Sequence, residues 1–119
     1  NPVRLLDTRP GQAACFTPGS PLAANVEQSQ QARGACQGEM IPQTARAIVG
    51  NATVVNSNGG FLTLWPSNAA KPLVATSNFV AGQTFNRHFT VGLGATGMFN
   101  IFASAQTDLI VDVSGFFAP

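Results

Sequence analysis

Charged residues are scarce in this sequence. Six Lys and Arg and five Asp and Glu make up 9% of the chain and give a formal net charge of +1. Six Lys and Arg are too few to form the basic surface that binding to phosphates requires. Nucleic acid is therefore not an expected partner. No apolar run approaches the roughly 20 residues of a membrane-spanning helix, so membrane insertion is not expected either. We predict one globular domain over residues 1–119, with 45% apolar residues for its core.

Histidine and cysteine are equally few. One histidine, His88, and two cysteines cannot assemble a Cys/His metal site. No nucleophile elbow such as G-x-S-x-G accompanies His88, which is expected at the surface. We therefore expect a protein that is not an enzyme and has no cofactor. Cys15 and Cys36 are predicted to form a disulfide closing a 22-residue loop (15 to 36 inclusive), with two free thiols in a reducing compartment as the alternative.

Turn residues and strand formers are abundant instead. Twelve Gly, eight Pro and nine Phe, with many Val, Thr and Asn, are typical of an all-β domain. We predict an antiparallel β-sandwich or jelly-roll-like barrel, with hairpin connections and with the first and last strands close together. Short apolar runs predict strands at Val3–Thr8, Ala47–Asn56, Phe61–Trp65, Val74–Val80, Thr84–Leu93, Met98–Ala103 and Asp108–Phe117. Glu27–Arg33 is predicted as an edge strand, with a short helix as the alternative.

One stretch matches a nucleotide-binding pattern. Gly92-Leu-Gly-Ala-Thr-Gly97 fits G-x-G-x-x-G and precedes Asp112 by the expected spacing. A dinucleotide site needs a helix that begins at those glycines and then a parallel strand. Too few residues separate Gly97 from Thr107 for that crossover, so a hairpin turn is predicted instead.

Opposite charges cluster at the two ends of the chain. Asp7 lies between Arg4 and Arg9 in the first strand, and Asp108 and Asp112 lie in the last. Because the arginines supply compensating charge, we predict structural ion pairs among Arg4, Asp7, Arg9 and Asp112. A calcium site built on the three aspartates is the alternative.

Two further features suggest contacts with carbohydrate. Phe61 and Trp65 fall on one face of a predicted strand, where an exposed aromatic pair would stack on sugar rings. Packing under the N-terminal loop or against a neighbouring subunit is the alternative for this pair. Asn51-Ala-Thr53 is the single N-x-S/T sequon and marks Asn51 as a candidate glycan acceptor.

The ends and the middle of the chain resemble a family of bacterial secreted modules. That family opens with a Val-Arg-x-x-Asp-Thr-Arg strand and closes with Asp-x-x-Gly-Tyr-Phe. Here the opening is Val3-Arg-Leu-Leu-Asp-Thr-Arg9 and the closing segment is Asp112-Val-Ser-Gly-Phe-Phe117. The intervening matches are Ile41-Pro42, the strand with Asn51-Ala-Thr53, Gly60-Phe-Leu-Thr-Leu-Trp-Pro66, Pro72 and Ser77-Asn-Phe79. Two positions depart from the pattern, Phe116 in place of Tyr and Gly50 where Leu is common.

The resemblance implies an extracellular β module of bacterial surface proteins with no established catalytic set. Together with the start at Asn1-Pro2 in place of Met, it predicts an extracellular or cell-surface location after removal of an N-terminal signal. We expect a structural subunit or repeat that forms a homo-oligomer or fibre through β surfaces, with Val3–Thr8 donated to a neighbouring copy and Glu27–Arg33 as its acceptor. The alternatives are a strand that pairs within its own sheet and a carbohydrate-binding module.

Overall fold

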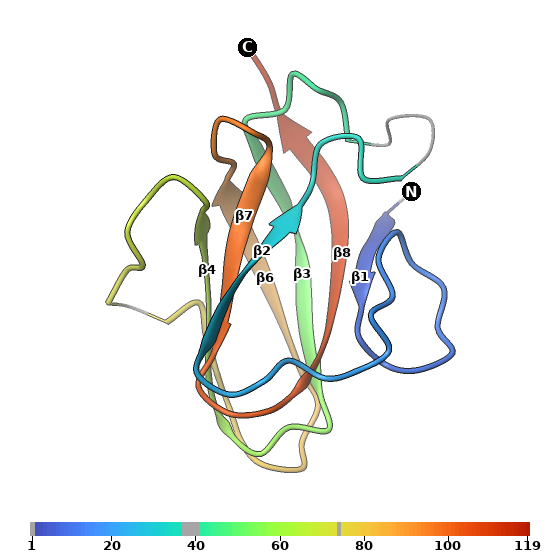
Figure 1. Cartoon of the computed structure of the whole chain (residues 1–119), viewed down its shortest axis with the longest axis vertical. Coiled ribbons are helices and arrows are strands. Elements are labelled where there is room, and N and C mark those ends of the chain that lie inside the picture. Colours follow the sequence, from blue (N-terminus) through green and yellow to red (C-terminus); the bar gives the residue numbers. More distant parts are fainter. Residues whose placement is uncertain (1, 37–40, 74) are drawn as a thin grey trace.

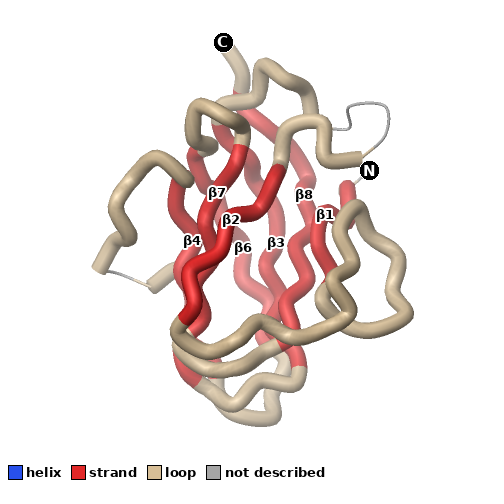
Figure 2. Tube along the Cα trace, viewed as in Figure 1, coloured by secondary structure: helices blue, strands red, loops and turns tan. Residues whose placement is uncertain are grey.

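Eight strands and no helix form the described part of the chain, residues 2–36, 41–73 and 75–119 of a computed structural model (Figures 1 and 2). The sequence correctly predicts an all-β domain. Its strands are β1 (Val3–Asp7), β2 (Val26–Gln31), β3 (Ala47–Val55), β4 (Gly60–Pro66), β5 (Ser77–Phe79), β6 (Phe85–Gly92), β7 (Met98–Ala103) and β8 (Asp108–Phe117).

The strands form two antiparallel four-stranded sheets, one behind the other in the view of Figure 2. The first sheet has the order β1-β8-β3-β6 and the second has the order β2-β7-β4-β5. This is the arrangement of a jelly roll, in which two Greek keys build a sandwich. The first and last strands pair directly, as expected (Figure 1).

The expected hairpin connections are mostly wrong. Among the described strands, only β4 and β5 are both consecutive in sequence and paired in a sheet. The segment Gly92–Gly97 illustrates the difference, because it joins β6 of the first sheet to β7 of the second. It is a turn, as predicted, closed by the Gly97 N–H donating to the Gly94 carbonyl oxygen at 2.9 Å. The chain therefore passes between sheets at nearly every turn.

Period-two alternation positions the core. Along β3, Ile48, Gly50, Ala52 and Val54 are buried, while the alternate residues of the strand are half exposed. Leu109, Val111 and Val113 of β8 also face inward, as the sequence predicts. Because successive strand side chains point to opposite faces, each sheet turns one apolar face to the other. The largest fully buried side chains include Phe99, Leu5, Ile41, Ile48, Leu62, Ile101 and Leu109.

Two predicted strands differ in their bounds from the strands in the structure. Glu27–Arg33 is the edge strand β2, not a helix, and it spans Val26–Gln31. The expected strand Val74–Val80 is the three-residue β5, and Val74 itself lies outside the described residues.

In the described part of the chain, no helix has the length and apolar character needed to cross a membrane.

Candidate functional site

The predicted ion pairs among Arg4, Asp7, Arg9 and Asp112 are present. Arg4 of β1 lies opposite Asp112 of β8, and its guanidinium donates two hydrogen bonds to that carboxylate, at 2.9 and 3.2 Å. Arg9 binds the Asp7 carboxylate through Nε at 3.0 Å and Nη2 at 2.7 Å. Arg4 Nη1 is also 3.7 Å from Asp7 Oδ2. The Arg4–Asp112 pair joins the two ends of the chain, as the sequence predicts, whereas the pairs of Asp7 with Arg9 and Arg4 are local to the first strand and its end.

Asp7 is the buried member of this network. Its carboxylate also accepts the Arg9 backbone N–H at 3.1 Å, and its side chain is fully buried. The hydrogen bonds from the Arg9 side chain hold the Asp7 pKa below its ordinary value, against the opposing effect of burial. The ionised carboxylate is therefore a structural anion of the first strand.

Acid is expected to weaken the fold through Asp7. Because its pKa is lower in the folded chain than in the unfolded chain, its contribution is present above the ordinary aspartate pKa of about 3.9 and is lost as the pH falls through the folded value. Asp7→Asn should be less stable than the wild type at neutral pH, and this gap should narrow below about pH 4. Urea unfolding at a series of pH values measures the gap; a gap independent of pH would contradict the assignment.

A second polar cluster lies beside the start of β8. The Thr8 hydroxyl donates to Asp108 Oδ1 at 2.7 Å and accepts the Leu109 N–H at 2.9 Å. Asn56 Nδ2 donates to Asp108 Oδ2 at 3.1 Å. Both Thr8 and Asp108 are buried, so these bonds satisfy groups that would otherwise be costly to desolvate. The three aspartates thus have protein partners, and no group of three His, Cys, Asp or Glu in the described chain is arranged to bind a metal.

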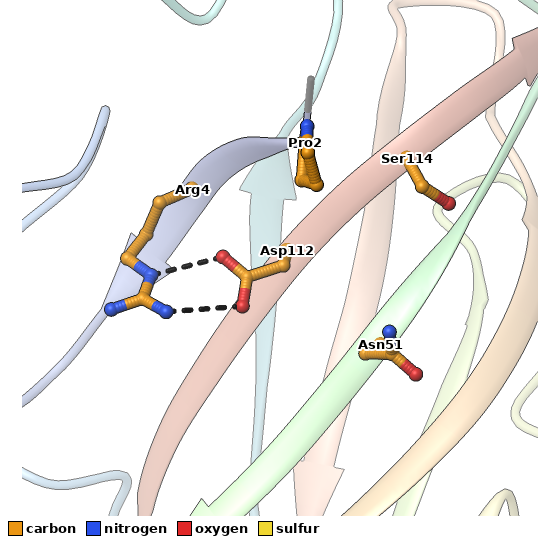
Figure 3. Close-up of a pocket in the computed structure, with 5 residues that line it drawn as sticks. All are labelled: Pro2, Arg4, Asn51, Asp112 and Ser114. Carbon is orange, nitrogen blue, oxygen red and sulfur yellow. Dashed lines mark hydrogen bonds and ion pairs between the residues drawn. The ribbon is translucent and has the colours of Figure 1, made fainter.

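Polar side chains cross the outer face of the first sheet in one row. The strand register places Arg4 opposite Asp112, Asp112 opposite Asn51, and Asn51 opposite His88. Arg4, Asn51 and Asp112, with Pro2 and Ser114, line a shallow cavity of about 350 Å³ (Figure 3). The Ser114 hydroxyl donates to the Val49 carbonyl oxygen at 3.2 Å rather than to an imidazole. His88 is exposed, as the sequence predicts.

The sequon belongs to the same face. Asn51 is half exposed in the middle of β3, between β6 and β8, and Thr53 follows it on the same side of the sheet. A glycan on Asn51 would project from the outer face of the first sheet and leave the strand edges clear.

The expected aromatic platform is not formed, because Trp65 is buried. Phe61 is 37% exposed but Trp65 only 2%. The segment after β4 explains this, since the Trp65 indole N–H donates to the Ala69 carbonyl oxygen at 3.1 Å. The neighbour of Phe61 is instead Phe102, with ring centroids 5.9 Å apart, and Lys71 Nζ lies 3.7 Å from the Phe102 centroid. A flat surface for stacking on sugar rings is therefore absent at this pair.

Cys15 and Cys36 form the predicted disulfide, with their Cα atoms 5.1 Å apart. The disulfide holds the segment at Cys15 and Phe16 against β1. The Cys15 and Phe16 N–H groups donate to the carbonyl oxygens of Arg4 and Leu5, each at 2.9 Å, and the Asp7 N–H donates to the Phe16 carbonyl oxygen at 3.1 Å. The disulfide thus anchors a segment that covers the outer edge of β1.

The other three sheet edges differ in their protection. β5 is only three residues long, and short edge strands offer little to a partner. β6 carries Arg87 on the inward side, opposite the buried Ala52, and an inward-pointing charge at an edge opposes strand addition. β2 has six residues, no Lys, Arg or Pro and a regular register with β7. Among the described residues, no backbone group pairs with its outer edge.

A groove opens beside β2, between the two sheets. Its volume is about 200 Å³, and its walls come from β2, from β1, from the loop between them and from Ile101 of β7. The lining residues are Leu6, Thr8, Phe16, Pro18, Leu22, Gln28, Ser29, Gln30 and Ile101. This open edge with its apolar groove is the candidate interaction site of the molecule. The edge strand is predictable from the sequence, whereas the groove is not.

Comparison with known proteins adds no assignment. No protein-family model matches the chain, and no curated protein matches its sequence.

Proposed function

We propose that this protein is a non-catalytic structural module of an extracellular assembly, a subunit or repeat that associates with copies of itself through β surfaces. The observation that carries the proposal is the unpaired edge of β2 beside an apolar groove. A strand added to such an edge gains main-chain hydrogen bonds, while its alternate side chains enter the groove.

The disulfide supports the extracellular part of the proposal. Disulfides persist in oxidising compartments, and the Cys15–Cys36 bond is compatible with an extracellular location. The strand β1 pairs with β8 of its own chain, which is the alternative to strand donation. Because β1 already pairs with β8 within the chain, association through β2 is favoured over donation of β1.

Self-association is the expected result in solution. Sedimentation velocity across a wide range of concentration should show species larger than the monomer that dissociate on dilution, and electron microscopy should show their shape. A chain that sediments as a monomer at every concentration would defeat the proposal. Assembly that survives deletion of residues 1–9 would separate it from a donated first strand, provided the deletion variant keeps its β-sheet circular dichroism.

A further inference from the structure

We propose that β2 pairs antiparallel with β2 of a second copy about a two-fold axis, joining two four-stranded sheets into one of eight strands. The inference rests on the proposed function and names its surface and partner. It begins from the sheet edges: β1 is covered by Cys15 and Phe16, β5 is short and β6 carries Arg87. For edge-to-edge contact between identical copies, β2 against β2 is the pairing that meets none of these obstacles.

The side chains of β2 are compatible with one another in this arrangement. A two-fold pair centred on Gln28 places Glu27 opposite Ser29 of the second copy and Gln30 opposite Val26 of the second copy. Glu27 is the one charged residue of the strand, so no like charges face each other directly. Inward-facing residues meet inward-facing residues, because an antiparallel pair in one sheet preserves its faces.

Each copy also supplies an apolar side chain and a place for it. Val26 lies on the inward side of β2 and is 49% exposed, whereas the groove beside Gln28 and Gln30 is lined by Leu6, Phe16, Leu22 and Ile101. In the register centred on Gln28, Val26 of one copy lies against the groove of the other. The two-fold axis repeats this contact, so each copy buries its Val26 in the groove of the other. The burial of apolar surface at both contacts favours the dimer.

This contact closes on itself. A two-fold contact uses the same patch on both copies and ends at the dimer, whereas a head-to-tail contact continues into a fibre. The β2 pair is therefore the building unit of the proposed assembly, and any filament requires a second, different contact.

Charge placed on the inward side of β2 tests the proposal. Val26→Lys removes the apolar contact with the groove of the second copy and places a cation in that groove. Gln28→Lys places a cation at the two-fold axis, where it faces its own symmetry mate. Each should raise the dimer dissociation constant by at least about tenfold. The matched control is Asn86→Lys on the exposed face of β6, which should leave dimerisation unchanged. Circular dichroism and urea unfolding confirm that each variant is folded.

Cross-linking tests the register independently. Gln28→Cys places one thiol beside its symmetry mate, so oxidation should give a covalent dimer that reductant converts back to monomers. Asn86→Cys should give no covalent dimer.

A wild type that is monomeric at every concentration defeats both this inference and the proposed function. A wild type that associates while both lysine variants associate equally well, or while Gln28→Cys does not cross-link, defeats the inference and leaves the proposed function standing.

Discussion

Replacing Gly50 with alanine is expected to lower the free energy of unfolding by about 3 kcal/mol. The register of β3 with β8 shifts between Val49 and Gly50, where β8 bulges. A Cβ at Gly50 would overlap the Asp112 carbonyl oxygen and lie 2.9 Å from the Val113 Cα, both of which are backbone atoms that no rotamer change can move. Because β3 is paired on both sides, with β8 and β6, the strand cannot shift to relieve the overlap.

Gly115→Ala is the matched control at the same bulge. A Cβ there would meet the Val49 Cγ1 methyl at 3.2 Å, a side-chain contact that small movements relieve, so we expect a cost of about 1 kcal/mol or less. Chemical denaturation of both variants compares the two costs. Equal midpoints for Gly50→Ala and Gly115→Ala would show that the bulge is not constrained as described.

The strands themselves were predictable because alternation and turn residues are local signals. The expected bounds of the strands nearly all agree with the structure within one or two residues. The sheet in which each strand lies was not predictable in this way. A turn such as Gly92–Gly97 has the same composition whether it closes a hairpin or carries the chain to the opposite sheet. The hairpin expectation failed at this point.

The candidate site shows the same division. Opposite charges in the first and last strands predicted the pairing of Arg4 and Asp112, because adjacent antiparallel strands place such side chains together. The alternation Phe85-Asn-Arg87-His-Phe89 also contained the inward position of Arg87, a signal that was available in the sequence. By contrast, the burial of Trp65 depends on Ala69 in the following loop. The groove beside β2 depends on residues from several separate segments, so it could not be inferred from any local pattern.

Removing the disulfide is expected to have an effect as large as Gly50→Ala. The cysteines are 21 positions apart, and the chain-entropy account gives a loss of roughly 3 kcal/mol for a loop of that length. Cys15→Ser combined with Cys36→Ser should therefore unfold at a clearly lower urea concentration, while the wild type treated with reductant should match the double variant. Equal stability of the oxidised wild type and the double variant would refute this role.

Loss of the disulfide should also change which sheet edge is exposed. The Asp7 N–H is protected by the Phe16 carbonyl oxygen, and Phe16 is held next to one of the two bonded cysteines. In the double variant we expect this amide to exchange with solvent faster by a larger factor than the Ala52 amide at the centre of the first sheet. Equal acceleration of both amides would indicate global destabilisation alone.

An uncovered β1 edge provides a second route to association, one that does not use β2. Val26→Lys weakens the proposed β2 contact, so with the disulfide intact this variant should be monomeric at concentrations at which the wild type associates. When the cysteine substitutions are added to Val26→Lys, association should return, because the outer backbone groups of β1 become free to pair with another chain. A triple variant that sediments as a folded monomer would limit the disulfide to a stabilising role. Association of the triple variant would show that the Cys15–Cys36 disulfide restricts assembly to the β2 edge, because it keeps the outer edge of β1 covered.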